Sequence, residues 1–116
     1  MRFKIFVHPD SAFLNALSHE LINDEDLKKA GVNFEPLVRT RSEPGLLIAI
    51  VTVSGTVMGA LITGLLGIVQ KSGGSTIVIQ SRHGSRLEIP ASTPLKKVDF
   101  YVTKLKEMEA EQIFLK

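Results

Sequence analysis

Residues 46–69 read LLIAIVTVSGTVMGALITGLLGIV and carry no charged side chain. A helix of this length extends about 36 Å at 1.5 Å per residue, slightly more than the roughly 30 Å hydrocarbon core of a bilayer. No other stretch of the chain demands so special an environment. The run therefore predicts a long apolar helix that spans a membrane.

A second interpretation of residues 46–69 stays open, because a helix that is apolar on all sides also occurs in the buried core of a protein or an oligomer. The rest of the 116-residue chain offers only short amphipathic elements to cover such a helix. Serine, threonine and glycine also make the run less hydrophobic than a leucine-rich span. These facts favour a multimeric assembly, either in a membrane or as a soluble homo-oligomer with the helix in its core.

Small residues recur at every fourth position of the run and form two adjacent faces of the predicted helix. The first face consists of Gly55, Gly59, Thr63 and Gly67, and the second consists of Thr52, Thr56, Ala60 and Gly64. Small side chains let helix backbones approach closely, which holds helices together in lipid. Two such faces, the pattern of a glycine zipper, favour a ring or bundle over a dimer. In a ring, hydroxyl groups would line a pore while Leu, Ile and Val faced lipid.

The segment before the run, residues 1–45, predicts an N-terminal β-α-β arm. Apolar residues alternate in its first strand and recur at three- and four-residue spacing in its first helix. The predicted elements are a strand over 3–7, a helix over 11–22, a short helix after the acidic cluster 24–26, and an irregular edge strand over 32–40.

The segment after the run, residues 70–116, predicts a hairpin and a helix. Two β-rich stretches, 76–80 and 86–89, flank a turn in which Gly84 can adopt positive φ. Pro94 suits the first position of an amphipathic helix over 94–112. The predicted fold class is thus α+β, in the order β-α-β, long apolar helix, β-hairpin and C-terminal amphipathic helix.

The relation between the two arms depends on the path of the run. If they form one domain around a shared sheet, both ends of the run lie on the same side of a membrane, and the run bends at Ser54-Gly55 into two short arms. Otherwise the arms stand apart and gain stability from neighbouring subunits, since each alone is too small for a stable core.

The sequence carries no recognisable catalytic or metal-binding motif. The absence of cysteine excludes disulfides, a cysteine nucleophile and thiolate metal sites. His19-Glu20 lacks the second histidine of a zinc-protease helix, Lys71-Ser-Gly-Gly lacks most of a phosphate-binding loop, and no Gly-x-Ser-x-Gly elbow is present. We therefore expect no enzyme activity, no catalytic residues, no metal and no cofactor.

Basic residues gather around the predicted hairpin turn. Arg82, His83 and Arg86, with Lys96 and Lys97 nearby in sequence, suit contact with acidic lipid headgroups or a partner protein. No interleaved aromatic residues support base stacking, so nucleic acid is not an expected partner.

The order of the predicted elements resembles that of a known family. The chain combines the N-terminal strand, the helix with Leu14, Leu17 and Leu21, the acidic turn 24–26, the glycine-rich run 46–69, Gly73-Gly74 and the hairpin 76–89. In this layout the sequence resembles the bacterial effector-associated constant component family of conflict systems, small proteins found beside caspase-like, trypsin-like and related effectors. The resemblance implies a non-enzymatic partner of an antiviral immune effector that acts at the membrane.

Two functional hypotheses follow. The first is a self-assembling membrane component that forms a pore or disrupts the membrane, located in the inner membrane of a bacterium or in the cytoplasm before assembly. The second is a soluble homo-oligomeric adaptor for an effector enzyme, with the apolar helix buried in its core. The expected partners are further copies of the chain, membrane lipid and a protease-like or other effector protein.

Overall fold

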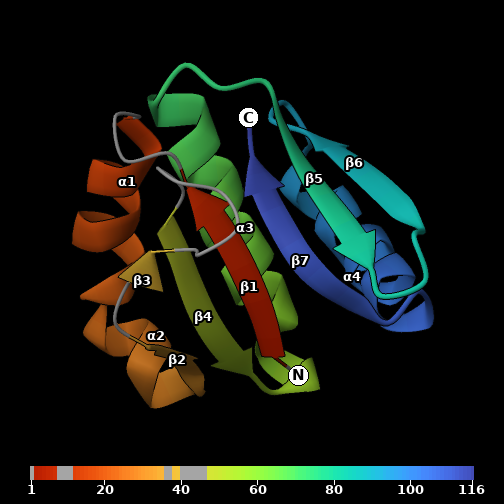
Figure 1. Cartoon of the computed structure of the whole chain (residues 1–116), viewed down its shortest axis with the longest axis horizontal. Coiled ribbons are helices and arrows are strands. Elements are labelled where there is room, and N and C mark those ends of the chain that lie inside the picture. The colour runs from red at the N-terminus through yellow and green to blue at the C-terminus, as the bar shows by residue number, and fades with distance from the viewer. Residues whose placement is uncertain (1, 8–11, 36–37, 40–46) are drawn as a thin grey trace.

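In the computed structural model, residues 2–7, 12–35, 38–39 and 47–116 are described, and they form one mixed sheet with helices on one face. Figure 1 labels the strands β1 (Arg2–Val7), β2 (Val32–Phe34), β3 (Val38–Arg39), β4 (Leu47–Val53), β5 (Thr76–Ser81), β6 (Arg86–Pro90) and β7 (Ala110–Leu115). The helical segments are α1 (Ala12–Ala16), a π-helical segment η1 (Leu17–Ile22), α2 (Glu25–Ala30), η2 (Gly55–Val57), α3 (Met58–Lys71), η3 (Leu95–Lys97) and α4 (Val98–Glu107).

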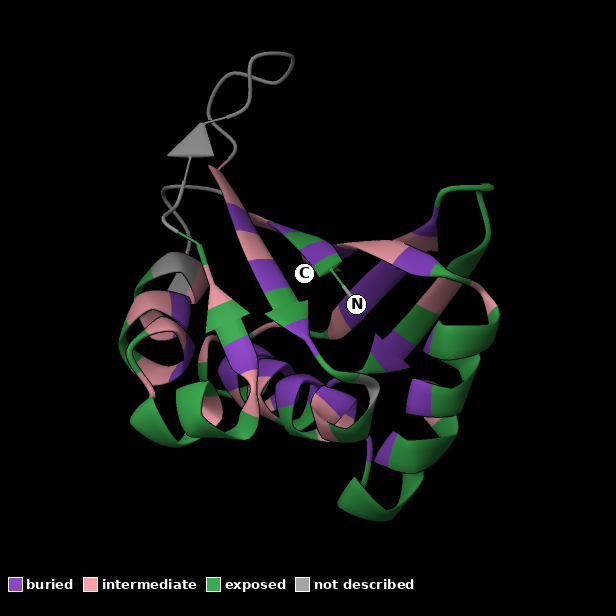
Figure 2. Cartoon of the chain, turned by 90° about the horizontal axis from the view of Figure 1, so that it is seen from below, coloured by how far each residue is buried: buried purple, intermediate pink, exposed green. Residues whose placement is uncertain are grey.

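The strand order is β2-β4-β1-β7-β5-β6, and β3 also pairs with β4. The pair β1 and β7 is parallel, while the other pairs are antiparallel. The segments before and after the apolar run thus supply strands to the same sheet. Figure 2 shows the helices packed together on one side of this sheet.

The prediction of one apolar helix over residues 46–69 is wrong. Leu47–Val53 forms strand β4, and the chain then passes through η2, a 3₁₀ turn, into helix α3. Leu46 lies outside the described residues. With 14 residues, α3 is roughly 21 Å long at 1.5 Å per residue. None of the helices in the described part of the chain combines the length and the apolar character that a membrane crossing requires.

The division of the run has a local cause. Strand β4 is rich in β-branched residues, which fit a pleated sheet better than a helix: Ile48, Ile50, Val51, Thr52 and Val53. Ser54 is extended at the point where the strand ends, and its hydroxyl lies 3.2 Å from that of Thr56 at the start of the turn. The chain therefore changes direction at Ser54-Gly55, the position that the sequence predicts for a bend. The part of the run before this bend is a strand and not a helical arm.

Helix α3 is buried by its own chain. Its inner face carries seven buried side chains, Met58, Leu61, Ile62, Leu65, Leu66, Ile68 and Val69. These pack against inward-facing strand residues such as Phe3, Ile5, Val51, Ile79 and Ile113, each fully buried. The hydrophobicity of the run thus serves the core of one small α+β domain and needs neither lipid nor a second subunit to cover it.

The prediction of a helix over 94–112 is also wrong at its C-terminal end. Helix α4 ends at Glu107, Glu109 adopts a positive φ of 54°, and the chain reverses into β7. This strand lies between β1 and β5. Its backbone satisfies the hydrogen-bonding groups of both neighbours, and this tertiary pairing overrides the helix preference of the Glu109–Gln112 segment.

Other predicted elements are present. The hairpin β5-β6 turns at Gly84, whose φ is 88°. The short helix α2 is capped by Asp24, whose carboxylate accepts hydrogen bonds from the backbone N–H groups of Asp26 and Leu27, and Gly31 ends it at a φ of 104°. The first helix, predicted over 11–22, is present as α1 followed by η1, while residue 11 lies outside the described part.

Gly64 and Gly67 provide a test of how closely η1 packs on α3. A Cβ at Gly64 would lie 2.6 Å from Cδ2 of the buried Leu21, whereas a Cβ at Gly67 would meet no described atom within 4 Å. Gly67→Ala should therefore raise the free energy of unfolding by about 0.5–1 kcal/mol, because alanine favours the helix. Gly64→Ala should be at least about 1 kcal/mol less stable than Gly67→Ala, because Leu21 must move.

Urea unfolding followed by circular dichroism measures both variants under the same conditions. Equal stabilisation by the two alanines would contradict the close contact of η1 with α3.

Candidate functional site: the open face of the sheet

No described helix covers the second face of the sheet, which we call the open face (Figure 2). Side chains alternate between the two faces along each strand. Because Phe3, Ile5 and Val7 point to the helices, Arg2, Lys4 and Phe6 lie on the open face.

An apolar row crosses four strands on the open face. The register pairs Ile48 with Phe6, Phe6 with Phe114, and Phe114 with Val78. The Phe6 and Phe114 rings stack with centroids 4.8 Å apart and planes 10° from parallel. Val78 is only 1% exposed, and the other three side chains of the row are half-buried. The row therefore forms a small second apolar cluster on the side of the sheet away from the main core.

The neighbouring row on the same face is mainly polar. It runs from Ile50 through Lys4 and Gln112 to Gln80 and Arg86. Lys4 lies on β1, one of the two central strands, and makes no ion pair with any described residue. A cation at this position is available to a carboxylate or another anion from a binding partner.

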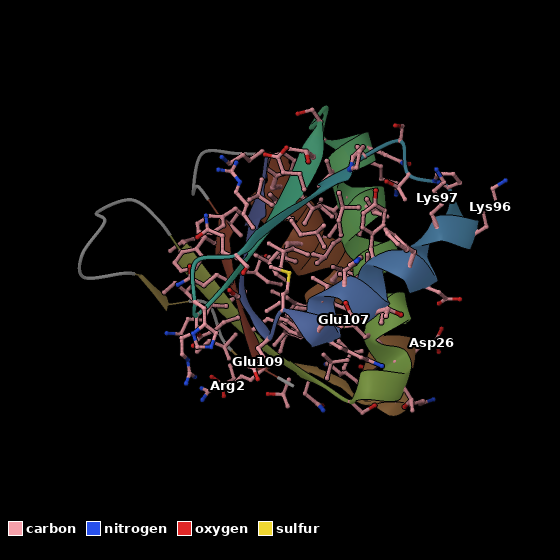
Figure 3. The ribbon with its side chains drawn as sticks, turned by 90° about the vertical axis from the view of Figure 1, so that its right-hand side faces the viewer. Arg2, Asp26, Lys96, Lys97, Glu107 and Glu109 are labelled. Carbon is pink, nitrogen blue, oxygen red and sulfur yellow. The ribbon has the colours of Figure 1, made fainter. Side chains whose placement is uncertain are left out.

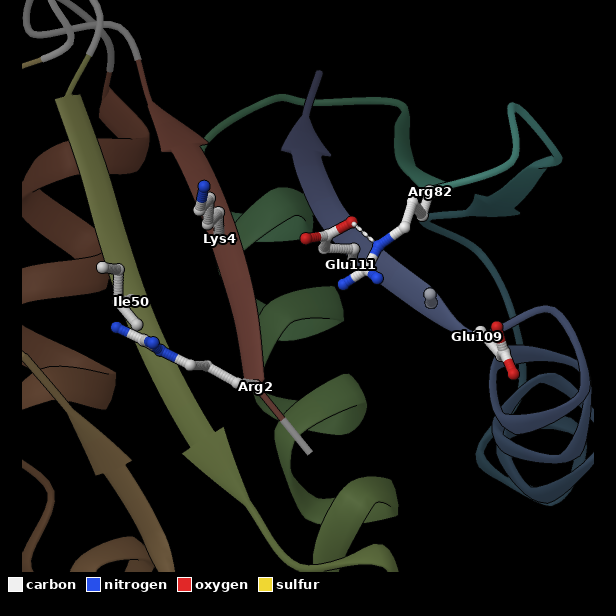
Figure 4. A pocket seen from close by; sticks show the side chains of 7 residues that line it. Arg2, Lys4, Ile50, Arg82, Glu109 and Glu111 are labelled. Atoms are coloured by element: carbon white, nitrogen blue, oxygen red, sulfur yellow. Dashed lines mark ion pairs between the residues drawn. The ribbon is translucent and has the colours of Figure 1, made fainter.

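A hollow of about 660 Å³ opens where β1 and β7 diverge. The two strands pair from Lys4 to Phe6, and a register shift near Gln80 and Ser81 accompanies the start of β7. The hollow is lined by Arg2, Lys4, Ile50, Arg82, Glu109, Ala110 and Glu111 (Figure 4). Its wall thus carries three cations and two carboxylates.

Three ion pairs lie at or beside this hollow. Arg82 Nε is 3.5 Å from a Glu111 carboxylate oxygen, and Arg2 is 3.7 Å from the Glu35 carboxylate. His83 Nε2 lies 3.4 Å from the carboxylate of Glu109, an interaction that is ionic only when the imidazole is protonated. These side chains are largely exposed, so each pair contributes little to stability. Their main effect is to set a pattern of positive and negative charge around the hollow.

The basic residues predicted to contact headgroups lie in the β5-β6 hairpin. Arg82 pairs with Glu111, His83 with Glu109, and Arg86 with Glu88 at 2.9 Å. Lys96 and Lys97 follow β6 at the end opposite the turn, in η3. The structure therefore does not bring these lysines together with the hairpin turn, and carboxylates surround the cations of the turn.

The predicted helix-packing residues are divided among three elements. Thr52 lies on β4, Gly55 and Thr56 lie in η2, and the other five, Gly59, Ala60, Thr63, Gly64 and Gly67, lie on the outer side of α3. Those five line a shallow groove of about 480 Å³ between α3 and the η1-α2 segment. Within the chain, Gly64 permits the close approach of Leu21, and an ion pair between Lys71 and Glu20 crosses the end of the groove.

In the described residues, no group of three or more His, Asp or Glu side chains is placed to hold a metal ion. Comparisons with protein-family models, curated proteins and solved structures find no match for this chain.

The open face is not predicted by the sequence, because strand β7 is not predicted. Phe6 alternates with the inward residues of β1, so the sequence does indicate that its side chain faces the other side of the sheet. Its partner Phe114 lies in the segment just beyond the predicted helix, where no strand was expected. The stack of Phe6 on Phe114 therefore could not be predicted without the long-range pairing of β1 with β7.

The stack of Phe6 on Phe114 should be measurable by a double-mutant cycle. Phe6→Leu and Phe114→Leu should show a coupling of about 0.5–1.5 kcal/mol in the free energy of unfolding, because aromatic pairs contribute beyond their buried area. Phe34 on β2 serves as the control, since its backbone partner Val51 faces the helices. A cycle of Phe34→Leu with Phe114→Leu should be additive, and equal coupling in both cycles would contradict the stack.

Proposed function

We propose that the chain is a non-enzymatic, self-associating adaptor whose copies meet through the open face of the sheet. The observation that carries this proposal is the apolar row on the open face, where Ile48, Phe6 and Phe114 are half-buried and no described helix covers them. Contiguous apolar surface bordered by polar groups is typical of protein-protein interfaces.

The charges around the row favour a second copy of the chain as the occupant. A two-fold interface brings the same surface patch of both copies together, so it must be self-complementary. The open face and its margin carry Lys4 and Arg86 together with Glu88 and Glu111. A patch with both signs can pair with its own rotated copy, whereas a patch of one sign would repel it.

The proposed contact differs from the oligomer that the sequence predicts. In that oligomer, the copies bury the apolar run 46–69 between them. Because α3 is already buried by its own sheet, the open face is the better surface for association. The adaptor role itself is supported by the resemblance to the effector-associated constant component family, which implies a non-enzymatic protein that works beside an immune effector.

Sedimentation equilibrium tests the proposed contact. Wild-type protein should show a concentration-dependent increase in mass, and Ile50→Lys should raise the dissociation constant by about tenfold or more, because it adds a cation beside the apolar row. Ile50 is half-buried on β4, so the thermal unfolding of the variant is measured in parallel.

Thr63→Lys is the matched control, since it adds the same charge at an exposed position of α3 on the other side of the sheet. It should leave the mass distribution unchanged. Wild-type protein that stays monomeric at the highest accessible concentration would overturn the proposal, as would equal effects of the two substitutions.

A further inference from the structure

Two large apolar side chains stand exposed at the start of α4. Leu95 in η3 is 72% exposed, and Phe100 in the first turn of α4 is 58% exposed. The same segment buries Val98, Val102 and Leu105 against the core, so it is held firmly in place. The outward positions of Leu95 and Phe100 are therefore a fixed feature of the fold.

Lysines surround these two side chains. Lys96 and Lys97 lie between them in sequence, and Lys104 Nζ is 5.5 Å from the centre of the Phe100 ring. None of these three lysines forms an ion pair with a residue of the described part of the chain. Over η3 and α4, residues 95–107, four lysines are opposed by two carboxylates, those of Asp99 and Glu107. This distinguishes the segment from the hairpin turn, where each cation has a carboxylate beside it.

The segment also projects from the molecule. Figure 3 shows Lys96 and Lys97 at the end of the helical segment that points away from the rest of the fold. We call Leu95, Lys96, Lys97, Phe100 and Lys104 the α4 patch. Leu95 directly precedes these lysines in η3, and the high exposure of Leu95 and Phe100 leaves both side chains free to enter a lipid surface.

We propose that the α4 patch binds an anionic lipid surface. Leu95 and Phe100 would enter the boundary between headgroups and acyl chains, while the lysine ammonium groups contact lipid phosphates. Lipid phosphates fit the unpaired positive charge, and the acyl boundary fits apolar side chains beside that charge. This binding is peripheral and requires no membrane-spanning helix.

The lipid site is separate from the proposed self-association surface. Helix α4 lies on the helix-covered side of the sheet, and the open face lies on the other (Figure 2). Copies joined through their open faces would leave their α4 patches accessible. Several patches in one assembly would then strengthen attachment to the same membrane.

Co-sedimentation with vesicles tests this inference on the full chain. Wild-type protein should bind phosphatidylcholine vesicles that contain phosphatidylglycerol, bind pure phosphatidylcholine vesicles far less, and detach as salt is raised. Lys96→Glu with Lys97→Glu should weaken binding by about tenfold or more. The matched control is Lys28→Glu with Lys29→Glu on α2, which changes the net charge equally at another exposed site and should bind like the wild type.

A fluorescent reporter tests insertion directly, because the chain contains no tryptophan. Phe100→Trp should shift its emission to shorter wavelength on addition of phosphatidylglycerol vesicles, while Lys29→Trp should not. Leu95→Ser with Phe100→Ser should reduce vesicle binding with only a small change in thermal unfolding, since both side chains are mostly exposed.

Three outcomes would overturn the inference. They are absence of binding to phosphatidylglycerol vesicles at low salt, equal losses in the two charge-reversal variants, and an unshifted Phe100→Trp emission in the presence of bound vesicles. If the protein does not bind phosphatidylglycerol vesicles, an acidic protein surface is the remaining candidate partner for the α4 patch.

Discussion

The pairing of β7 with both β1 and β5 is the constraint on which the fold depends. Strand β1 is the first described element of the chain and β7 is the last, yet they lie side by side in the middle of the sheet (Figure 1). Beyond the end of β7, Lys116 and Thr76 exchange backbone hydrogen bonds of 3.0 Å. Without β7, β1 and β5 would each present an unpaired edge, and the two parts of the sheet would have no direct connection. The same pairing brings Phe6 against Phe114 on the open face.

This long-range pairing explains what the sequence predicts and what it does not. The hairpin, the cap at Asp24 and the inward phase of β1 follow from local patterns, because turns, caps and alternation are set by neighbouring residues. Strand β7 begins in a segment that favours helix and is fixed by partners far away in the chain. Its position is therefore not contained in the local pattern.

The apolar run misleads for a related reason. Strand β4 is apolar at its outward positions Ile48 and Ile50 as well as at its inward positions, so it shows no alternation. Followed directly by the apolar helix α3, it resembles one long helix in length and composition. Its β-branched content and the Ser54-Gly55 pair carry the information that separates the two elements. The ion pairs around the hollow, such as that of Arg82 with Glu111, again depend on β7 and could not be read from the sequence.

The fold divides the surface into two regions with different chemistry. The open face combines an apolar row with charges of both signs, which favours contact with another folded surface. The α4 patch combines exposed apolar side chains with three lysines that form no ion pair with a described residue, which favours an anionic lipid surface. Because these regions lie on opposite sides of the sheet, self-association and attachment to a membrane are compatible in one small domain.

Backbone chemical shifts from nuclear magnetic resonance would distinguish this fold from one with a single long apolar helix. The structure predicts strand-type Cα and Cβ shifts for residues 47–53 and 110–115, and helical shifts for 58–71. It also predicts long-range nuclear Overhauser effects between the backbones of Ile5 and Ile113, which are paired in the sheet. Uninterrupted helical shifts over residues 46–69, or helical shifts that continue through residue 112, would contradict it.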